Sequence, residues 1–383
     1  DMLTTAGIDF MRIGNEYSCD PQYRQHLVSH AIDGDARLAA ITSRLHGARV
    51  VVGTTSTLMA RPFVFALKRF TLAVIDEAGQ ITEPNIIGLL AAHNAAQPDM
   101  ALIERFILVG DYKQLPAVVQ QSPDESAVTE ECLRGIGVCD CRDSLFERLI
   151  RHERSAGRTD FIGVLRRQGR MHPDVADFPN RMFYFSERLI TVPLPHQSAK
   201  SLGYKPAPLD ATDRLLCSKR MLFFESKACR TESMSDKANP YEARLTAQLL
   251  RRLRRLYGEG FDARRSVGVI VPYRNQIAMI RKEIDRMQMP ELKGVTIDTV
   301  ERYQGSQRDV IIYSFTIHSR WQIDFLAANR FVEDGHVIDR KLNVALTRAR
   351  CQMIMTGNRE VLSADPLFAE LIDYVGCSTA TEV

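Results

Sequence analysis

The chain has 383 residues, enough for two ordinary domains, and its 45% hydrophobic and 25% charged residues are typical of a globular protein. Fifty basic and 47 acidic side chains give a formal net charge of +3, which neither requires nor excludes a nucleic-acid partner. No apolar run approaches the roughly 18 residues of a membrane span, and no signal peptide opens the chain. We therefore expect an intracellular protein, cytoplasmic if bacterial, that has no membrane partner.

Eight cysteines are scattered along the chain, and Cys132, Cys139 and Cys141 are the only close group. A zinc or iron–sulfur site is one interpretation, but metal sites usually show paired CxxC spacing and this group has none. The simpler interpretation is a set of reduced thiols in a cytosolic protein.

The first predicted elements are a helix end at Gly7 and a short strand over residues 8–13. Because the chain does not begin with Met and opens on what resembles the inside of a helix, we expect its first residue to be a cut. A second buried strand is predicted over residues 49–53, and Thr54 and Thr55 follow it. Their hydroxyls suit contacts with phosphates and equally suit capping of the next helix, so both interpretations stay open.

The apolar run at residues 72–75 predicts a strand buried on both faces, and Asp76 and Glu77 come directly after it. Open parallel sheets place ligands at the carboxyl ends of their strands. An acidic pair at such an end suits a hydrated Mg²⁺ ion and the activation of a water molecule. Two idle, solvated acids are an equally good interpretation of this pair taken alone.

The strand predicted over residues 106–109 is followed by Gly110, Asp111, Gln114 and Pro116. Gly110 permits a tight turn, and Pro116 fixes its exit. The acid, base and amide between them could sense a γ-phosphate and its attacking water. A plain surface loop is the alternative, although a strand followed by GDxxQLP is rarer by chance than a strand followed by two acids.

A new strand is predicted over residues 161–165, and it precedes Arg166, Arg167 and Arg170. Three arginines at the end of a strand suit a polyphosphate or a nucleic-acid backbone. A domain boundary is expected near this point. The two predicted domains are residues 1–160 and 161–383.

After a long loop predicted over residues 183–218, strands again alternate with helices. Strands are predicted over residues 221–224, 267–272, 295–298, 310–315 and 352–356, and helices over residues 242–257 and 342–350. The basic run at residues 251–255 is interpreted as a solvated helix face in preference to a nucleic-acid contact. This alternation predicts α/β domains with parallel sheets and with sites on the loops.

The loops described above resemble, in order, the motifs of superfamily 1 helicases. The closest subgroup contains the nonsense-mediated-decay RNA helicase and the replication helicase–nuclease. The six matching segments are VIDEAGQ (74–80), GDYKQLP (110–116), RRQGRMHPDVADFPNRMFY (166–184), VGVIVPYRNQI (267–277), DTVERYQGSQRDVII (298–312) and LNVALTRAR (342–350). The resemblance implies two RecA-like α/β domains of the P-loop NTPase fold, ATP and Mg²⁺ as cofactors, and single-stranded DNA or RNA as the partner.

The resemblance also implies roles for individual residues. Asp76 would hold Mg²⁺, Glu77 would orient or deprotonate the attacking water, and Gln114 would sense the γ-phosphate. Arg170 and Arg348 would be arginine fingers that stabilise the transition state. The remaining candidates are Gly110, Asp111, Gly305 and Gln307 for the nucleotide, and Thr54, Thr55, Arg274 and Thr299 for the single strand.

Three departures from the family pattern matter. Gly169 stands where the family usually has a tyrosine that stacks on the adenine, and Gln307 stands where an acid usually meets the ribose. No GxxxxGK(S/T) phosphate loop occurs in the 383 residues. We therefore expect the chain to be the C-terminal part of a helicase, with its first domain truncated at the N-terminus, and we expect this part alone to hydrolyse ATP poorly.

The sequence thus predicts an ATP-dependent helicase or translocase on single-stranded nucleic acid. DNA is favoured over RNA, and 5′-to-3′ movement is implied by the resemblance. The alternative is a module without ATPase activity that serves as a nucleic-acid-binding or scaffold protein. The complete set of transition-state residues argues against this alternative, because binding alone does not need them.

Overall fold

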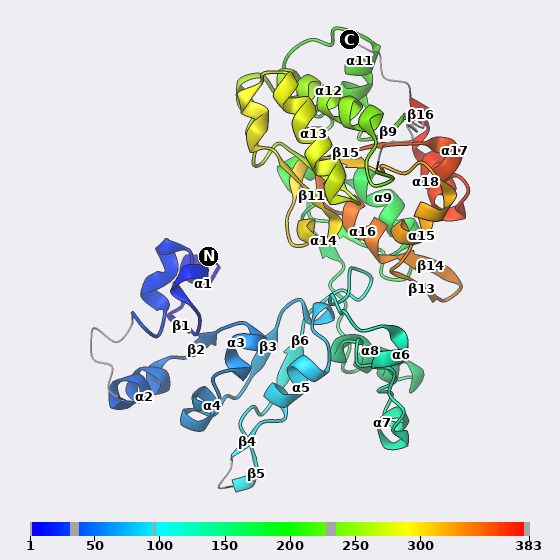
Figure 1. Cartoon of the computed structure of the whole chain (residues 1–383). Helices are drawn as coiled ribbons and strands as arrows, with labels where there is room; N and C mark the ends of the chain where they lie inside the picture. The colour runs from blue at the N-terminus through cyan, green and yellow to red at the C-terminus, as the bar shows by residue number, and fades with distance from the viewer. Residues whose placement is uncertain (1, 31–37, 95–96, 227–234, 379–383) are drawn as a thin grey trace. The chain divides into compact units, whose positions relative to one another are not determined.

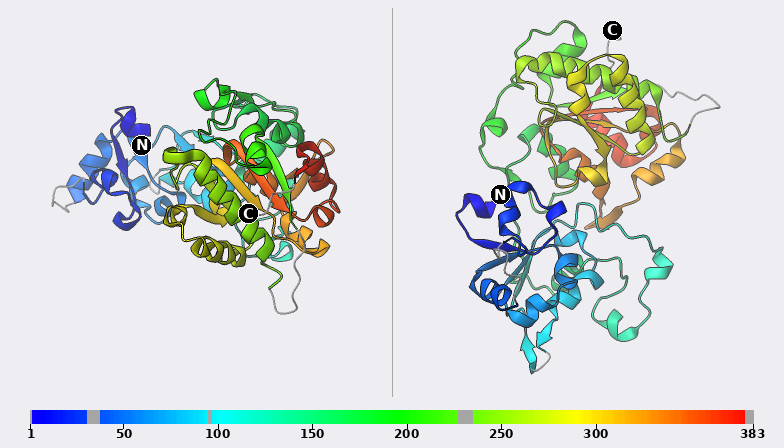
Figure 2. Two further views of the ribbon diagram at one scale, coloured as in Figure 1. Left: turned by 90° about the horizontal axis from the view of Figure 1, so that it is seen from above. Right: turned by 60° about the vertical axis from the view of Figure 1, so that its left-hand side comes forward.

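The computed structural model describes residues 2–30, 38–94, 97–226 and 235–378. The chain divides into two compact units, which are described one at a time. Residues 1–112 and 116–162 form the first unit, and residues 113–115 and 163–383 form the second. Figures 1 and 2 colour the first unit from blue to blue-green and the second from green to red. No helix within the described ranges is long and apolar enough to cross a membrane.

The first unit is built on short strand pairs. The parallel pairs are β1 (Phe10–Arg12) with β2 (Val50–Val52) and β3 (Ala73–Ile75) with β6 (Phe106–Leu108), and the antiparallel pair is β4 (His93–Asn94) with β5 (Gln97–Ala101). The helices are α1 (Met2–Thr5), α2 (Leu38–Gly47), α3 (Thr55–Met59), α4 (Phe63–Leu67), α5 (Pro84–Leu90), α6 (Pro123–Ser126), α7 (Glu131–Gly135) and α8 (Leu145–Ser155). Strand β2, predicted to be buried, is half-buried to exposed along its length.

Strand β3 is buried on one face only, which corrects the prediction that the apolar run ending at Ile75 is buried on both faces. Ile75 belongs to a small core with Ile86 of α5 and Leu145 of α8. On the opposite face, Val74 is 63% exposed and its register partner Ile107 is 50% exposed. An apolar run permits burial on both faces, but burial also needs a second covering layer. The described residues provide that layer on one side only.

The second unit holds a six-stranded sheet in which every neighbouring pair is parallel, in the order β11-β10-β12-β15-β9-β16. Its strands are β9 (Met221–Glu225), β10 (Val267–Val271), β11 (Thr296–Thr299), β12 (Arg308–Ser314), β15 (Ala349–Gly357) and β16 (Cys377–Ser378). Two separate pairs are β7 (Arg167–Gln168) with β8 (Ile190–Thr191), and the hairpin β13 (Arg330–Glu333) with β14 (His336–Asp339). The predicted α/β class with parallel sheets is confirmed.

Helices connect and cover these strands. They are α9 (Pro173–Met182), α10 (Pro195–Ser198), α11 (Ala211–Ser218), α12 (Pro240–Tyr257), α13 (Arg274–Arg286), α14 (Val300–Tyr303), α15 (Ile323–Leu326), α16 (Arg340–Leu346), α17 (Arg359–Leu362) and α18 (Pro366–Val375). Helix α12 begins where Asn239 accepts the N–H of Glu242 at 3.1 Å, and it ends at Gly258, whose φ is 57°. Its leucines recur at helical spacing and are buried, as predicted.

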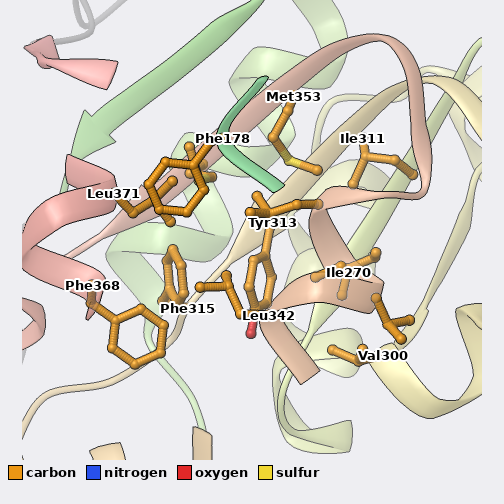
Figure 3. Close-up of a cluster of buried hydrophobic side chains, with 14 of the residues drawn as sticks. Phe178, Ile270, Val300, Ile311, Tyr313, Phe315, Leu342, Met353, Phe368 and Leu371 are labelled. Atoms are coloured by element: carbon orange, nitrogen blue, oxygen red, sulfur yellow. The ribbon is translucent and has the colours of Figure 1, made fainter. Parts of the chain in front are cut away.

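Both faces of the six-stranded sheet carry a hydrophobic core. Figure 3 shows one face, where Tyr313 and Phe315 lie among Phe178 of α9, Phe368 of α18 and Leu342 of α16. On the other face, α12 and α13 pack leucines and isoleucines against the sheet. Burying a side chain of this size stabilises the fold by roughly 2–3 kcal/mol, so this unit has a substantial core.

Residues 161–165 form no strand, contrary to the prediction. Phe161 and Leu165 are exposed, and strand pairing begins only at β7. An apolar run forms a strand only where a neighbouring strand offers hydrogen bonds, and none of the described residues pairs with these five.

The prediction of a loop over residues 183–218 is also wrong in part, because β8, α10 and α11 lie within it.

The helix predicted over residues 342–350 ends early. Helix α16 stops at Leu346, and the chain enters β15 three residues later. The hydroxyl of Thr347 donates to the carbonyl of Asn343 at 2.8 Å, and Arg348 Nε donates to the carbonyl of Val344 at 3.1 Å. The carbonyl of Asn343 also accepts the N–H of Thr347, whereas the carbonyl of Val344 is satisfied by the Arg348 side chain in place of a further turn of helix.

The basic run of α12 is not simply a solvated face, which corrects that interpretation. Arg252 is buried and pairs with Asp210 at 2.7 Å and with Asp213 at 3.0 Å. Arg255 also pairs with Asp213. The acids belong to the start of α11, about 40 residues earlier, so helical periodicity could not reveal them.

Candidate active site

The chain turns sharply where β3 ends, and both predicted acids lie in that turn. Asp76 and Glu77 are exposed, and Glu77 adopts the left-handed backbone conformation (φ 53°), which costs a residue with a side chain about 1–2 kcal/mol. Asp76 Oδ1 accepts the N–H of Glu77 at 2.9 Å, and Gln80 Nε2 donates to Glu77 Oε2 at 2.7 Å. We call Asp76 and Glu77 the acidic turn. It presents two carboxylates to solvent directly after the end of β3.

The donor set of the acidic turn fits a magnesium ion held mainly by water and phosphate. Mg²⁺ keeps several waters and takes one or two carboxylates together with substrate phosphates, and Asp76 offers one exposed carboxylate. No group of three or more histidine, cysteine and acidic residues within the described ranges could hold a metal ion. Cys132, Cys139 and Cys141 are exposed free thiols.

Gly110 lets the loops after β3 and β6 approach each other. A Cβ at Gly110 would lie 3.0 Å from the backbone N of Gly79 and 3.3 Å from that of Ala78. The N–H of Ala78 also donates to the carbonyl of Val109 at 2.8 Å. These contacts bring two predicted nucleotide-binding residues, Gly110 and Asp111, to the loop that carries the acidic turn.

Four predicted residues come together within the second unit. Arg348 is 1% exposed, and its Nη2 donates to Gln114 Oε1 at 3.1 Å. Arg170 Nε donates to Gln307 Oε1 at 3.0 Å, and Arg170 Nη1 donates to the carbonyl of Thr347 at 3.3 Å. We call Gln114, Arg170, Gln307 and Arg348 the arginine cluster. Two guanidinium groups beside two amides suit a polyphosphate anion.

Lys113 anchors the segment that carries Gln114. It is 1% exposed, and its Nζ lies 2.8 Å from the carboxylates of both Glu187 and Glu333. Lys113 also donates to the carbonyl of Phe183 at 2.9 Å, and its own carbonyl accepts from Asn343 Nδ2 at 2.8 Å. This role could not be predicted from the sequence, because a lysine in a polar loop carries no signal of burial.

The turn that presents Arg170 is built by polar side chains. Gln168 Oε1 accepts the N–H groups of Arg170 and Met171 at 3.0 and 2.8 Å. Gln197 Nε2 donates to the carbonyls of Gln168 and Met171, both at 2.9 Å. His196 Nε2 lies 2.8 Å from the carbonyl of Arg170. By contrast, the other two arginines of the predicted trio, at 166 and 167, are exposed.

Two glycines of the predicted site differ in their need to be glycine. Gly305 has a φ of 78°, in the region that disfavours a Cβ. A Cβ on Gly169 would meet only Leu194 Cδ1, at the ordinary contact distance of 3.4 Å. The backbone at residue 169 could therefore carry a Cβ atom.

The predicted nucleic-acid residues fall into two groups. In the second unit, Arg274 opens α13 just after β10, and Thr299 ends the adjacent strand β11. These two share the carboxyl edge of the sheet, where open α/β sheets place ligands. In the first unit, the hydroxyl of Thr54 accepts the N–H of Thr57 at 3.2 Å and caps α3, whose first residue is Thr55.

A buried acid at the same carboxyl edge was missed by the sequence reasoning. Glu242 is fully buried, and its Oε2 accepts from the Ser314 hydroxyl, the Thr316 N–H and the Thr356 hydroxyl at 2.7, 3.0 and 3.2 Å. Its Oε1 accepts from the Ser226 hydroxyl at 3.0 Å. Burial raises the pKa of Glu242 to about 7, although these hydrogen bonds lower it. The donors lie at or just after the ends of three different strands, so no local pattern could reveal them.

The chain is similar to helicase sequences over almost its whole length. A family model described as an AAA domain matches residues 141–360, and a second model with the same description matches residues 6–122. The DNA replication ATP-dependent helicase/nuclease JHS1 of Arabidopsis thaliana is 30% identical over 97% of this chain and 25% of its own length. The corresponding helicase/nuclease DNA2 of Xenopus laevis is 27% identical over 98% of this chain and 33% of its own length.

A third relative is not a helicase/nuclease by name. The Regulator of nonsense transcripts 1 of Dictyostelium discoideum is 27% identical over 80% of this chain and 20% of its own length. The chain thus spans a fifth to a third of the length of these relatives. Because the family models match the segments that carry the six motifs, the chain belongs to the AAA-domain family and, with these relatives, to the superfamily 1 helicases.

Proposed function

We propose that the chain is the part of an ATP-dependent helicase or translocase that carries the acidic turn and the arginine cluster. The observation that carries this proposal is the buried Arg348 guanidinium, hydrogen-bonded to Gln114 in the same cluster as Arg170. Phosphoryl transfer needs cations and a γ-phosphate contact held in place before the reaction, whereas nucleic-acid binding alone does not.

In this proposal each residue has one role. Asp76 holds Mg²⁺, and Glu77 orients the attacking water or takes its proton. Gln114 contacts the γ-phosphate, and Arg170 and Arg348 stabilise the negative charge that develops on it. Mg²⁺, when bound, supplies further charge neutralisation on the phosphates. Nucleotide contacts are assigned to Gly110, Asp111, Gly305 and Gln307, and strand contacts to Thr54, Thr55, Arg274 and Thr299.

The phosphate loop is proposed to come from outside these 383 residues in the whole protein. The exposed face of β3 and β6 supports this, because Val74 and Ile107 form an apolar patch that one further helix would bury. The greater length of the relatives leaves room for such a segment.

The strand bound is proposed to be DNA in preference to RNA, with movement from 5′ to 3′ and an intracellular location. The names of two of the relatives contain the words "DNA replication", which supports DNA. The name of the third contains the word "transcripts", which supports RNA. The groups at the carboxyl edge suit contacts with phosphates, which both nucleic acids share.

The test is ATP hydrolysis by a longer protein that includes a phosphate loop, with single-stranded DNA and RNA compared. We expect Glu77→Gln to lower the strand-stimulated rate at least about a hundredfold, because an amide cannot take a proton. Glu131→Gln, at an exposed acid of α7, is the matched control and should leave the rate unchanged. Equal rates in Glu77→Gln and wild type would refute the role of Glu77. Strand binding without any hydrolysis in the wild type would favour the ATPase-inactive module instead.

A further inference from the structure

The loop after β12 presents the only tryptophan of the chain to solvent. Trp321 is 58% exposed and lies in a 3₁₀ turn (Arg320–Gln322) that leads directly into α15. Phe325 follows four residues later and is 42% exposed. Trp321 and Phe325 are therefore two exposed aromatic residues of one short segment.

The two rings differ in what they already contact. The Phe325 ring stacks on Tyr273 with a centroid distance of 4.9 Å and an interplanar angle of 22°. Lys341 Nζ lies 4.0 Å from the Phe325 centroid and 3.3 Å from the Glu301 carboxylate. Phe325 is therefore engaged within the protein. No ring or cation among the described residues stacks on Trp321, so its indole is the ring that remains for a ligand.

The turn that carries Trp321 is fixed by hydrogen bonds of a buried side chain. Gln322 is buried, and its Oε1 accepts the N–H groups of His318 and Ser319 at 2.7 and 3.0 Å. Its Nε2 donates to the carbonyl of Asp236 at 2.7 Å. A side chain presented on a fixed turn loses little backbone freedom when it binds, which favours affinity.

The position of this turn fits a nucleic-acid strand. Strands β11, β10 and β12 are consecutive in the sheet, and their carboxyl ends lead to Thr299, Arg274 and Trp321. Arg274 and Arg320 are exposed cations near these ends, and Asp324 is an exposed acid on the same turn. Proteins that bind single strands combine cations for the backbone with aromatic rings on which bases stack.

We propose that Trp321 is a base-stacking residue for the single strand at this edge of the sheet. The inference rests on the proposed function, because it requires that the strand bind at the carboxyl edge of the six-stranded sheet. A flat, exposed ring next to the exposed Arg320 suits a base and its phosphate, which is why we favour a nucleic-acid strand over a protein partner.

The single tryptophan makes the test direct, because tryptophan emission from the 383-residue chain reports position 321 alone. The probes are a 15-nucleotide oligothymidylate and an abasic phosphodiester strand of the same length, with binding measured separately by anisotropy of a dye label. We expect oligothymidylate to quench the emission by about half or more at saturation and the abasic strand to leave it nearly unchanged. Binding of oligothymidylate without any change in emission would overturn the stacking role and leave the proposed function standing. Failure of both strands to bind would overturn strand binding by this chain and the inference with it.

Substitutions give a second readout. Trp321→Ala should weaken oligothymidylate binding about tenfold and abasic-strand binding less than twofold, whereas Trp321→Phe should keep most of the affinity. Phe161→Ala, at another exposed aromatic residue, is the matched control and should change neither. Equal effects of Trp321→Ala on both strands, or no effect on either, would contradict base stacking.

Discussion

Two glutamates of this chain lie in opposite environments, and each environment sets what the carboxyl group can do. Glu77 is exposed, and its left-handed backbone points to a turn maintained at some cost, as is common at functional sites. Glu242 is fully buried among hydroxyl and N–H donors, and burial raises its pKa to about 7. Glu77 is therefore available to a nucleotide, while the charge state of Glu242 is tied to the stability of the sheet edge.

Replacing Glu242 by glutamine should change how stability depends on pH. Folding raises the pKa of this group from 4.5 to about 7, so between these values the folded state binds more protons than the unfolded state. The contribution of this group to stability is fully present below pH 4.5 and is lost as the pH rises through 7. We expect Glu242→Gln to equal the wild type near pH 4.5 and to exceed it by about 3 kcal/mol in free energy of unfolding at pH 8.

Urea unfolding at the two pH values measures this difference. In the variant, the amide oxygen can occupy the place of Oε2 and accept the Thr316 N–H, and the amide nitrogen can donate to the Ser226 hydroxyl. Glu225→Gln, at the exposed end of β9, is the matched control and should show the wild-type pH dependence. The same pH dependence in Glu242→Gln and wild type would contradict a raised pKa.

At the scale of elements, the short segment at residues 113–115 belongs to the second unit although the chain on either side of it belongs to the first. Lys113 is its anchor, with two carboxylates compensating one buried ammonium group. Lys113→Met should lower the free energy of unfolding of the second unit by about 3 kcal/mol, because Glu187 and Glu333 would face each other without a cation. Denaturant unfolding followed by circular dichroism measures the loss.

A compensated variant separates charge from packing. Lys113→Met combined with Glu187→Gln and Glu333→Gln should recover most of the lost stability, since no uncompensated charge remains. If Lys113→Met does not lower the free energy of unfolding, or if the triple variant does not recover it, the charges of Lys113, Glu187 and Glu333 do not hold residues 113–115 in place.

The elements show how far the sequence could predict the fold. Helix α12 was predicted well because its cap and its leucine spacing are local signals. The burial of β3 was not predicted correctly, because it depends on a covering layer. The end of α16 was not predicted correctly either, because it depends on side chains that donate to helix carbonyls. In the candidate site, the motifs identified Gln114 and Arg348, but the anchoring role of Lys113 depends on acids more than 70 residues away.

At the scale of the whole molecule, the proposed chemistry is divided between the two units. The acidic turn lies in the first unit, and the arginine cluster lies in the second. The proposed roles assign residues of both units to one reaction, so we expect substitutions in either unit to impair ATP hydrolysis. We therefore expect an arginine of the second unit to matter as much to hydrolysis as Glu77 does.

Single-turnover ATP hydrolysis in a longer protein that includes a phosphate loop, with single-stranded DNA present, tests the assignment of the arginine cluster to the γ-phosphate. Arg170→Lys keeps the charge but loses the planar fork that contacts Gln307 and the Thr347 carbonyl, and we expect the rate to fall about a thousandfold. Arg167→Lys, at an exposed arginine three residues earlier, should keep the wild-type rate, and matching unfolding curves should show that both variants are folded. An Arg170→Lys rate within a few-fold of the wild type would contradict the assignment of the arginine cluster to the γ-phosphate.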